Sequence, residues 1–337
     1  MILVTGGTGL VGSHLLYHLC LSKQKIRAIY RNKAHLSKVK NVFSYYDKNF
    51  LPLFKKIEWV EACIEDVPAI TLAFADVNVV YHCAALVSFN PKDYIKMRRT
   101  NIKGTANMVN LSIDFGIKKF CYVSSIATLG DSIKKGNVTE ENEWNSADKS
   151  GYAITKYGAE QEVWRASQEG LNVVMVNPGV IVGPGFWQSG TGQLFSSIYK
   201  GLKFYATGIT GFVGVNDVVK AMIALTESSL NLERYILVSD NINFKAFFNL
   251  IADALNVKKP TIKVTKFLGA IAWRIDWLKY LLTNKPPLFT KESAHSLQEK
   301  TFYSSQKIVA TLGFKFEPIS KVIKETAKYF KKKSLSF

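Results

Sequence analysis

The feature that most constrains the fold is a glycine-rich turn between a strand-length apolar run and a helix-like segment. The apolar run Ile2–Thr5 ends directly before Gly6, and Gly9 and Gly12 follow at regular intervals. At this spacing Gly6 permits a tight turn, Gly9 lets a pyrophosphate approach the backbone, and Gly12 lets the helix pack closely on the strand. The free N–H groups and positive dipole at the start of that helix attract phosphate. The pattern predicts a nucleotide-binding Rossmann fold that begins at the first residue. The expected contacts in this turn are Gly6, Thr8, Gly9, Leu10, Val11 and Gly12.

Strand and helix patterns alternate along the first half of the chain. Short β-branched runs separated by segments with helical spacing are typical of a parallel sheet with crossover helices. The near-continuous apolar run Val77–Tyr81 fits a strand that is covered on both faces. We therefore predict an α/β fold with a doubly wound parallel sheet. The predicted strands are Ile2–Thr5, Lys25–Tyr30, Ile57–Glu61, Val77–His82, Lys119–Ser124 and Asn172–Asn177, and the predicted helices are Leu10–Leu21, Pro91–Phe115 and Tyr152–Gln168.

A second, smaller domain is expected after Pro178, where the pattern loosens. Loop signals occur at Gly183–Gly185 and Ser189–Gly192. A helix over Asp217–Glu227 and a strand over Tyr235–Val238 are expected to return to the main sheet. The predicted division is an NAD(P)-binding Rossmann domain over residues 1–180, to which 204–238 returns, and an interleaved C-terminal substrate-binding domain over 181–203 and 239–330.

Composition and charge narrow the class of protein. With 47% hydrophobic residues over 337 positions, the chain is able to bury a substantial core. The net charge is +18, but the lysines are scattered and Lys331–Lys333 is the one tight run. This distribution favours a basic solvated surface over a face that binds nucleic acid. We recognise no signal peptide and no apolar stretch of about 18 residues, so a cytoplasmic location is expected.

The cysteines and histidines show no spacing typical of a metal site. The four cysteines contain no CxxC pair and are interpreted as small apolar residues in a reducing compartment. His14 and His18 lie one helical turn apart without a partner carboxylate, and His35 and His295 stand alone. We therefore expect no bound metal.

Tyr152 and Lys156 form a candidate acid–base pair. Because they lie four residues apart on a predicted helix, their side chains share one face. A tyrosine with an ordinary pKa of about 10 is a poor base, and a nearby ammonium lowers that pKa by stabilising the phenolate. Tyr152 is then able to exchange a proton with an alcohol or alkoxide. Ser125 follows the fifth predicted strand and is placed to hydrogen-bond the same oxygen, although the adjacent Ser124 is an alternative. The competing interpretation is a surface tyrosine beside a solvated lysine.

Further motifs, in order along the chain, make it resemble the extended short-chain dehydrogenase/reductases. The resemblance runs from residue 1 to about residue 320 and is specific in its combination of motifs. It implies an NAD(P)-dependent oxidoreductase of the NAD-dependent epimerase/dehydratase superfamily, in which a nicotinamide carries the hydride. The motifs are Thr5 with the glycine turn, His82-Cys83-Ala84-Ala85, Asn101-Ile102-Lys103-Gly104-Thr105, Val123-Ser124-Ser125, Tyr152-x-x-x-Lys156, Asn177-Pro178 with Gly183-Pro184, and Phe212–Val218.

The resemblance also implies roles for individual residues. Ser125 is expected to hydrogen-bond the substrate oxygen, Lys156 to contact the nicotinamide ribose, and Asn101 to support the site from its helix. Further cofactor contacts are expected from Ala84, Ala85, Pro178 and Val180.

The end of the second predicted strand indicates which nicotinamide cofactor is bound. An NAD-binding enzyme usually places Asp or Glu there to accept from the ribose 2′-hydroxyl. Here Arg31 directly follows the strand and is suited to bind a 2′-phosphate, with Lys33 or Lys38 adding charge. NADP(H) is therefore preferred over NAD(H), although the alternative is that Arg31 simply faces solvent. At the adenine end Cys63 stands where the family often has an acidic residue, so contacts are expected from backbone groups, Ile64 and Cys63.

Three classes of function compete. They are a carbonyl reductase or alcohol dehydrogenase resembling dihydroflavonol reductases and 3β-hydroxysteroid dehydrogenases, a sugar-nucleotide epimerase or dehydratase, and a non-catalytic NAD(P)-binding regulator. The residues after Ser125 lack the Asp-Glu pair of a dehydratase, and Asn177 replaces the arginine that many epimerases carry before this proline. The presence of Ser125, Tyr152 and Lys156 together disfavours a regulator. We therefore favour a reductase, with the epimerase as the alternative.

The predicted loops at the carboxyl ends of the strands carry apolar side chains. These are the positions where open α/β sheets bind ligands. They predict a small-molecule substrate with an apolar or aromatic body, or equally a set of residues that pack the two domains together. The residues are Val87, Phe89, Phe186 and Trp187.

Two other kinds of partner are considered. Phe267–Leu282 is amphipathic and resembles a helix lying on a membrane, but packing within the second domain is favoured, so membrane association is not expected. By the family resemblance, the helices Pro91–Phe115 and Tyr152–Gln168 are candidates to pair across a twofold axis in a homodimer.

Overall fold

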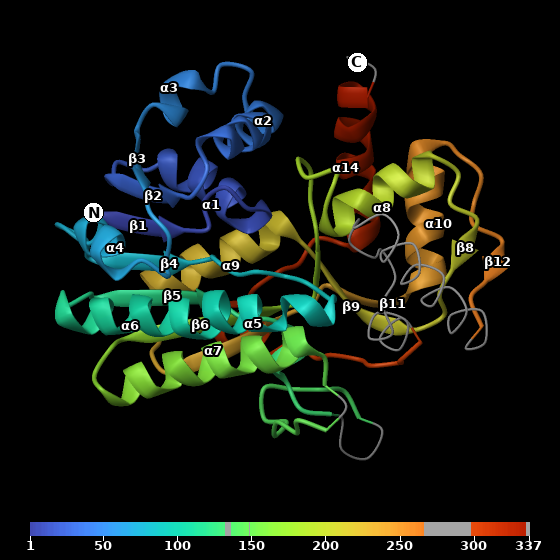
Figure 1. Cartoon of the computed structure of the whole chain (residues 1–337). Coiled ribbons are helices and arrows are strands. Elements are labelled where there is room, and N and C mark those ends of the chain that lie inside the picture. Colours follow the sequence, from blue (N-terminus) through green and yellow to red (C-terminus); the bar gives the residue numbers. More distant parts are fainter. Residues whose placement is uncertain (132–135, 148, 266–297, 335–337) are drawn as a thin grey trace.

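A seven-stranded parallel sheet forms the centre of the computed structural model, which describes residues 1–131, 136–147, 149–265 and 298–334 (Figure 1). The strand order is β10-β6-β5-β4-β1-β2-β3, with every neighbouring pair parallel. The order reverses between β1 and β4, which is where an open α/β sheet binds ligands. The doubly wound sheet predicted from the sequence is confirmed. The strands are β1 (Ile2–Thr5), β2 (Ile26–Tyr30), β3 (Ile57–Glu61), β4 (Val79–His82), β5 (Lys119–Val123), β6 (Val173–Pro178) and β10 (Glu233–Leu237).

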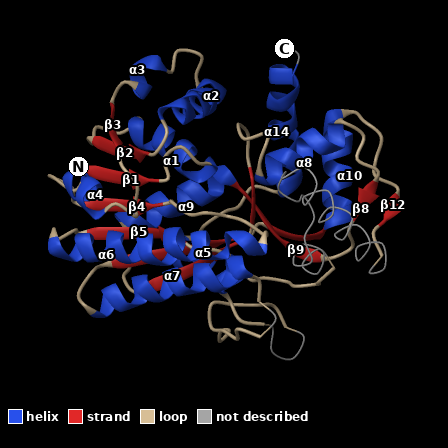
Figure 2. Ribbon diagram, viewed as in Figure 1, coloured by secondary structure: helices blue, strands red, loops and turns tan. Residues whose placement is uncertain are grey.

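Helices cover both faces of this sheet (Figures 1 and 2). Successive strand residues point to opposite faces, so Ile2 and Val4 pack into one core and Leu3 into the other. The first core is completed by α1 (Leu10–Cys20) and α9 (Val215–Glu227), and the second by α6 (Gly104–Asp114) and α7 (Gly151–Gln168). Burial on both sides explains why these strands are near-continuous apolar runs. Further elements here are η1 (Lys33–His35), α2 (Leu36–Tyr46), α3 (Leu51–Phe54), α4 (Val67–Ala73), η4 (Ile126–Thr128) and α13 (Gln306–Leu312).

The helix predicted over Pro91–Phe115 is present, but it is wound as four consecutive elements. These are η2 (Pro91–Asp93), α5 (Tyr94–Met97), η3 (Arg98–Lys103) and α6. The η3 segment is π-helical and buries Thr100 and Asn101. Such wide turns inside helices occur frequently at functional sites.

A smaller group of elements lies on the right of Figure 1, beyond the carboxyl ends of the central strands. Its core includes the stacked rings of Phe212 and Phe247. One sheet has the order β11-β9-β7 and a second pairs β12 with β8. The elements are β7 (Val180–Val182), α8 (Gly190–Tyr199), β8 (Phe204–Tyr205), β9 (Ile209–Gly214), β11 (Asp240–Asn243), α10 (Phe244–Leu255), β12 (Ile262–Lys263) and α14 (Ile319–Ser334).

Strand pairing divides the segment 204–238, which was expected to return to the main sheet. Strands β8 and β9 pair within the smaller group, whereas α9 and β10 do return. Glycines permit this close pairing, since a Cβ on Gly179 would lie 2.4 Å from the carbonyl oxygen of Gly211. The loop expected at Ser189–Gly192 is wrong, because α8 begins there. Gly192 allows the first helical turn to approach the backbone of Phe186.

Two predicted features fall outside the described residues, namely the amphipathic segment Phe267–Leu282 and His295. Within the described part of the chain, no helix is both long enough and apolar enough to cross a membrane.

Candidate active site

A cavity of about 580 Å³ opens at the carboxyl ends of the central strands. Its volume is in the range of cofactor and small-molecule sites. The glycine turn, the ends of β2, β4 and β5, and the first turns of α7 and α8 contribute to its wall. The predicted site residues that line it are Gly6, Thr8, Gly9, Leu10, Val11, Gly12, Arg31, Ile64, Ala84, Ala85, Val87, Ser125, Tyr152, Lys156, Pro178 and Phe186.

The glycines of the turn expose their backbone at the edge of this cavity. Gly6 has a φ of 66°, and a Cβ on it would lie 2.6 Å from the amide nitrogen of Ala84. A Cβ on Gly12 would lie 2.3 Å from the carbonyl oxygen of Gly6. Helix α1 begins directly after Gly9, so its N-terminus borders the cavity. The turn therefore fits the pyrophosphate of a dinucleotide, which binds where backbone N–H groups and a helix dipole converge.

Basic and polar side chains line the cavity beyond the end of β2. Arg31 and Lys38, both exposed, contribute to the wall together with His35. Lys33 lies in η1, outside this lining. Sequence reasoning missed His35, although its position four residues after Arg31 was a usable signal.

The segment after β3 presents alternate residues to the cavity. Ala62 and Ile64 line it, and Cys63 between them does not. In extended backbone, successive side chains point to opposite sides, which explains this alternation.

Tyr152 and Ser125 meet in the cavity wall. Ser150 begins α7, and its hydroxyl accepts from the amide of Ala153 at 3.1 Å, which fixes the first turn that carries Tyr152. Burial raises the pKa of Tyr152, and the neighbouring side chain of Ser125 lowers it. The hydroxyl of Ser124 instead donates to the carboxylate of Glu160 at 2.5 Å. Ser125, rather than Ser124, is therefore the serine whose side chain acts on the tyrosine, because Ser124 is engaged with Glu160.

Lys156 is buried one helical turn further along α7. Its ammonium donates to the hydroxyl of Tyr122 at 2.6 Å and to the carbonyl of Val123 at 2.8 Å. Burial lowers the pKa of Lys156 to about 7, while the negative charge of Glu160 opposes that shift. This differs from the expectation that Lys156 lowers the pKa of Tyr152. Here burial outweighs the other influences on the tyrosine, and the ammonium is engaged with β5.

A series of buried polar side chains leads from Lys156 to the glycine turn. Next to Tyr122 lies Thr105, whose hydroxyl is 3.0 Å from Nε2 of His82. Nδ1 of His82 lies 2.6 Å from the hydroxyl of Thr5, which precedes Gly6. Burial lowers the pKa of His82 to about 3, and the charge of Lys156 acts in the same direction. This series therefore connects the acid–base pair to the nucleotide-binding turn through a neutral histidine.

Asn101 lies beside the cavity and hydrogen-bonds the loop after β4 and helix α7. Its amide oxygen accepts from the backbone of Leu86 at 2.7 Å, and its amide nitrogen donates to the carbonyl of Leu86 and to the hydroxyl of Thr155. It thereby ties the loop after β4 to α7.

The four apolar residues expected around the substrate have different surroundings. Val87 and Phe186 line the cavity. Phe89 lies against the ring of Tyr152, with centroids 6.0 Å apart. Trp187 packs on Phe195 and Phe330 in the smaller core, which is the packing alternative. Val180, an expected cofactor contact, also packs against that core.

This arrangement defines an NAD(P)-dependent enzyme built on a Rossmann fold. The chain matches the model of the NAD dependent epimerase/dehydratase family over residues 2–237. It belongs to that family and is an extended short-chain dehydrogenase/reductase, as the sequence motifs predicted.

Individual proteins are similar over nearly the whole chain. A putative dihydroflavonol 4-reductase from Synechocystis sp. is 27% identical, covering 97% of this chain and 93% of that protein. Anthocyanidin reductase from Arabidopsis thaliana is 26% identical, covering 98% and 95%. The fold is similar to that of UDP-glucose 4-epimerase from Thermotoga maritima, with a TM-score of 0.77, 20% identity and 99% of each chain covered.

Proposed function

We propose that the protein is an NADP(H)-dependent oxidoreductase that interconverts a carbonyl and a secondary alcohol on a small, partly apolar substrate. The observation that carries this proposal is that Ser125, Tyr152 and Lys156 line one cavity together with the glycine turn. Two hydroxyls that meet at one point are suited to bind a single substrate oxygen. The names of the two reductase relatives support the same reaction class.

In this proposal the residues of the protein move the proton. The nicotinamide, when bound, supplies or accepts the hydride. Tyr152 gives a proton to the substrate oxygen in reduction and takes it in oxidation, while Ser125 hydrogen-bonds that oxygen. Lys156, one turn along α7, supplies positive charge near the phenolate that forms when Tyr152 gives up its proton, while burial sets the pKa of the resting tyrosine. Asn101 fixes the loop after β4 relative to α7.

Arg31 and Lys38 support a preference for NADP(H). Both are exposed in the cavity wall beyond the end of β2, where the 2′ position of the adenine ribose is bound in this fold. A guanidinium binds a phosphate with two parallel hydrogen bonds, which a 2′-hydroxyl cannot reciprocate.

The apolar part of the substrate is assigned to Val87 and Phe186. Val87 is 60% exposed, which leaves its side chain accessible to a ligand at the cavity wall. A cytoplasmic location and a homodimer remain predictions from the sequence.

Nucleotide analysis of the purified protein tests the proposal. Mass spectrometry of the extracted nucleotide and titrations of NADPH and NADH are combined with NADPH consumption on a panel of ketones and aldehydes with apolar bodies. We expect little retained nucleotide, a lower Kd for NADPH than for NADH, and turnover of members of the panel. Tightly retained NAD without turnover would contradict the proposal and favour an epimerase, in which the cofactor is recycled in place.

A further inference from the structure

A buried carboxylate lies directly below the candidate active site. Glu160 is on α7, and its side chain is fully buried. It lies four residues after Lys156, which lies four residues after Tyr152, so all three share one face of the helix. Burying a carboxylate is costly unless it is paired and hydrogen-bonded, so its partners are the key to its role.

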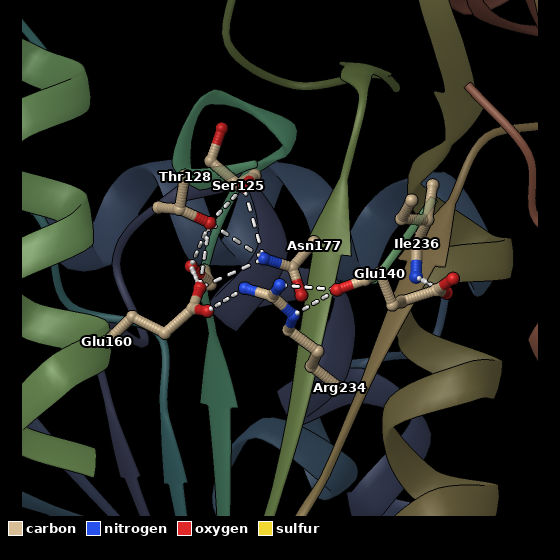
Figure 3. A network of polar contacts seen from close by, with 8 residues as sticks. Ser125, Thr128, Glu140, Glu160, Asn177, Arg234 and Ile236 are labelled. Carbon is tan, nitrogen blue, oxygen red and sulfur yellow. Dashed lines mark hydrogen bonds and ion pairs between the residues drawn. The ribbon is translucent and has the colours of Figure 1, made fainter. Parts of the chain in front are cut away.

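Three side chains, from the ends of β5 and β6 and from η4, surround one oxygen of this carboxylate (Figure 3). Oε2 of Glu160 accepts from Ser124, lies 2.8 Å from the hydroxyl of Thr128, and accepts from the amide of Asn177 at 3.0 Å. Its other oxygen, Oε1, pairs with Arg234 of β10 at 2.8 Å. The guanidinium of Arg234 also donates to the backbone carbonyl of Glu140. The carboxylate therefore connects α7 to β5, β6 and β10.

The same donors fix the backbone of Ser125. Its carbonyl lies 2.8 Å from the hydroxyl of Thr128 and accepts from the amide of Asn177 at 3.2 Å. The amide of Asn177 thus bridges Glu160 to Ser125, and the Thr128 hydroxyl lies between the same two acceptors, where its single hydrogen reaches either one. Because Glu160 and Tyr152 are on one rigid helix, this bridge sets the position of Ser125 relative to Tyr152.

We propose that Glu160 is a positioning residue that fixes Ser125 against Tyr152, with Arg234 balancing its buried charge. The inference rests on the proposed catalytic roles of Ser125 and Tyr152. A shift of about 1 Å in a positioned group is able to lower a rate by roughly a hundredfold, so the bridge has consequences for turnover.

Glu160 also influences the charge of Lys156. The groups facing Lys156 are Glu160 on α7, Tyr122 on β5 and Cys83 after β4, with His82 stacked behind Tyr122. Burial lowers the pKa of Lys156 and the negative charge of Glu160 opposes that shift. Removing the negative charge lowers the pKa further, so the ammonium is lost at a lower pH.

The test compares Glu160→Gln with Glu162→Gln, a partly exposed carboxylate on the same helix that pairs with Arg165. For Glu160→Gln we expect kcat for carbonyl reduction to fall at least tenfold, roughly, with the Kd for NADPH nearly unchanged. The basic limb of the kcat profile should move to lower pH. Hydrogen exchange should become faster at residues 124–129, where the amide of Thr128 donates to the Ser125 carbonyl. Glu162→Gln should match the wild type in all four measurements.

A second variant separates position from charge. Thr128→Val removes the bridging hydroxyl and retains the carboxylate, so it should lower kcat and leave the basic limb in place. If Glu160→Gln does not fold, Thr128→Val still tests whether the contacts around Glu160 position Ser125. Wild-type kcat and unchanged exchange over 124–129 in these variants would overturn the inference. Failure of the proposed function would be seen separately, as absent turnover by the wild type or retained turnover by Tyr152→Phe, whereas the exchange measurement needs no activity.

Discussion

At the residue scale, burial sets the ionisation of the candidate acid–base pair. It raises the pKa of Tyr152 and lowers the pKa of Lys156 to about 7, so both groups are biased toward their neutral forms. A neutral phenol is a proton donor. We therefore expect the protein to favour proton donation, the reductive direction, near neutral pH, and to lose this activity as pH rises and the phenol and ammonium lose their protons.

Replacing Tyr152 removes the hydroxyl that exchanges the proton. We expect Tyr152→Phe to lower kcat by about a hundredfold to ten-thousandfold, the usual contribution of a general acid, with the Kd for NADPH nearly unchanged. Steady-state kinetics and cofactor titration check this. Tyr157→Phe is the matched control, because Tyr157 lies on the same helix and stacks on Trp144. Equal kcat values for the two variants would rule out the role assigned to Tyr152.

Arg31 is expected to distinguish the two nicotinamide cofactors. Arg31→Ala should weaken NADPH binding by roughly tenfold to a hundredfold, the value of a lost charge-assisted hydrogen bond, and should change NADH binding little. Fluorescence titrations of both cofactors measure the ratio. Lys33→Ala, an exposed neighbour outside the cavity wall, is the control. A parallel loss for both cofactors would mean that Arg31 does not contact a 2′-phosphate.

At the scale of elements, the glycine turn must leave space for a bound ligand and must also let helix α1 pack closely against it. Gly9 stands at the start of α1, where the nearest atom to an added Cβ is the Gly6 carbonyl oxygen at 3.3 Å. Gly12 lies inside α1, where the same oxygen would be 2.3 Å away. Gly9 therefore leaves room for a ligand, and Gly12 leaves room for helix α1 to pack against the turn.

Alanine substitutions should separate these two requirements. Gly9→Ala should weaken nucleotide binding strongly, because its methyl group stands where phosphate approaches, while the free energy of unfolding changes little. Gly12→Ala should destabilise the fold by about 1–3 kcal/mol, the usual cost of overpacking, in addition to weakening binding. Denaturant titration and NADPH titration of both variants check this. Equal stability of the two variants would contradict the assignment of Gly12 to helix packing.

The helix predicted over Pro91–Phe115 contains a π-helical turn that residue spacing in the sequence does not reveal. Its apolar periodicity located the helix but not the π-helical turn at Arg98–Lys103, which buries Asn101 toward α7. The turn depends on contacts with α7 and the loop after β4, which are distant in sequence.

At the scale of the whole molecule, polar contacts join the two groups of elements. On α1, His14 lies within 3.0 Å of the carbonyl of Pro184 and 2.5 Å of the Tyr46 hydroxyl. On α14, Tyr329 donates to the carbonyl of Asn41 at 2.6 Å. The contacts of His14 with Pro184 and of Tyr329 with Asn41 lie between the two groups of elements, and the side chains of His14 and Tyr329 are both buried.

Acid should weaken the fold through His14. Burial lowers the pKa of His14 to about 4, against 6.5 when unfolded. Below pH 6.5 the unfolded chain therefore binds more protons than the folded one, so stability falls as pH drops from about 6.5 to 4. His14→Gln should flatten this dependence by up to about 1.4 kcal/mol per pH unit. Denaturant titrations across this range measure the slope, with exposed His35→Gln as the control. Identical slopes for His14→Gln and the wild type would refute the assignment.

The sequence by itself determined the features that depend on short-range spacing. The glycine turn, the alternation of strands and helices, and the Tyr152–Lys156 pair each involve residues within one or two turns of each other. Local geometry alone therefore fixes which side chains share a face. These patterns were sufficient to identify the family and the doubly wound sheet, which the comparisons and the structure confirm.

Only the tertiary structure decided which distant residues meet. Glu160 pairs with Arg234, which lies 74 positions later in the sequence. The Lys156 ammonium donates a hydrogen bond to the Tyr122 hydroxyl. Trp187 packs on Phe330 and does not line the cavity. Glu160 has the charge of an ordinary exposed helix residue, and Trp187 the apolar character of a substrate-binding residue. Their surroundings come from how α7, β10 and α14 pack, and packing between elements leaves no regular period in the sequence.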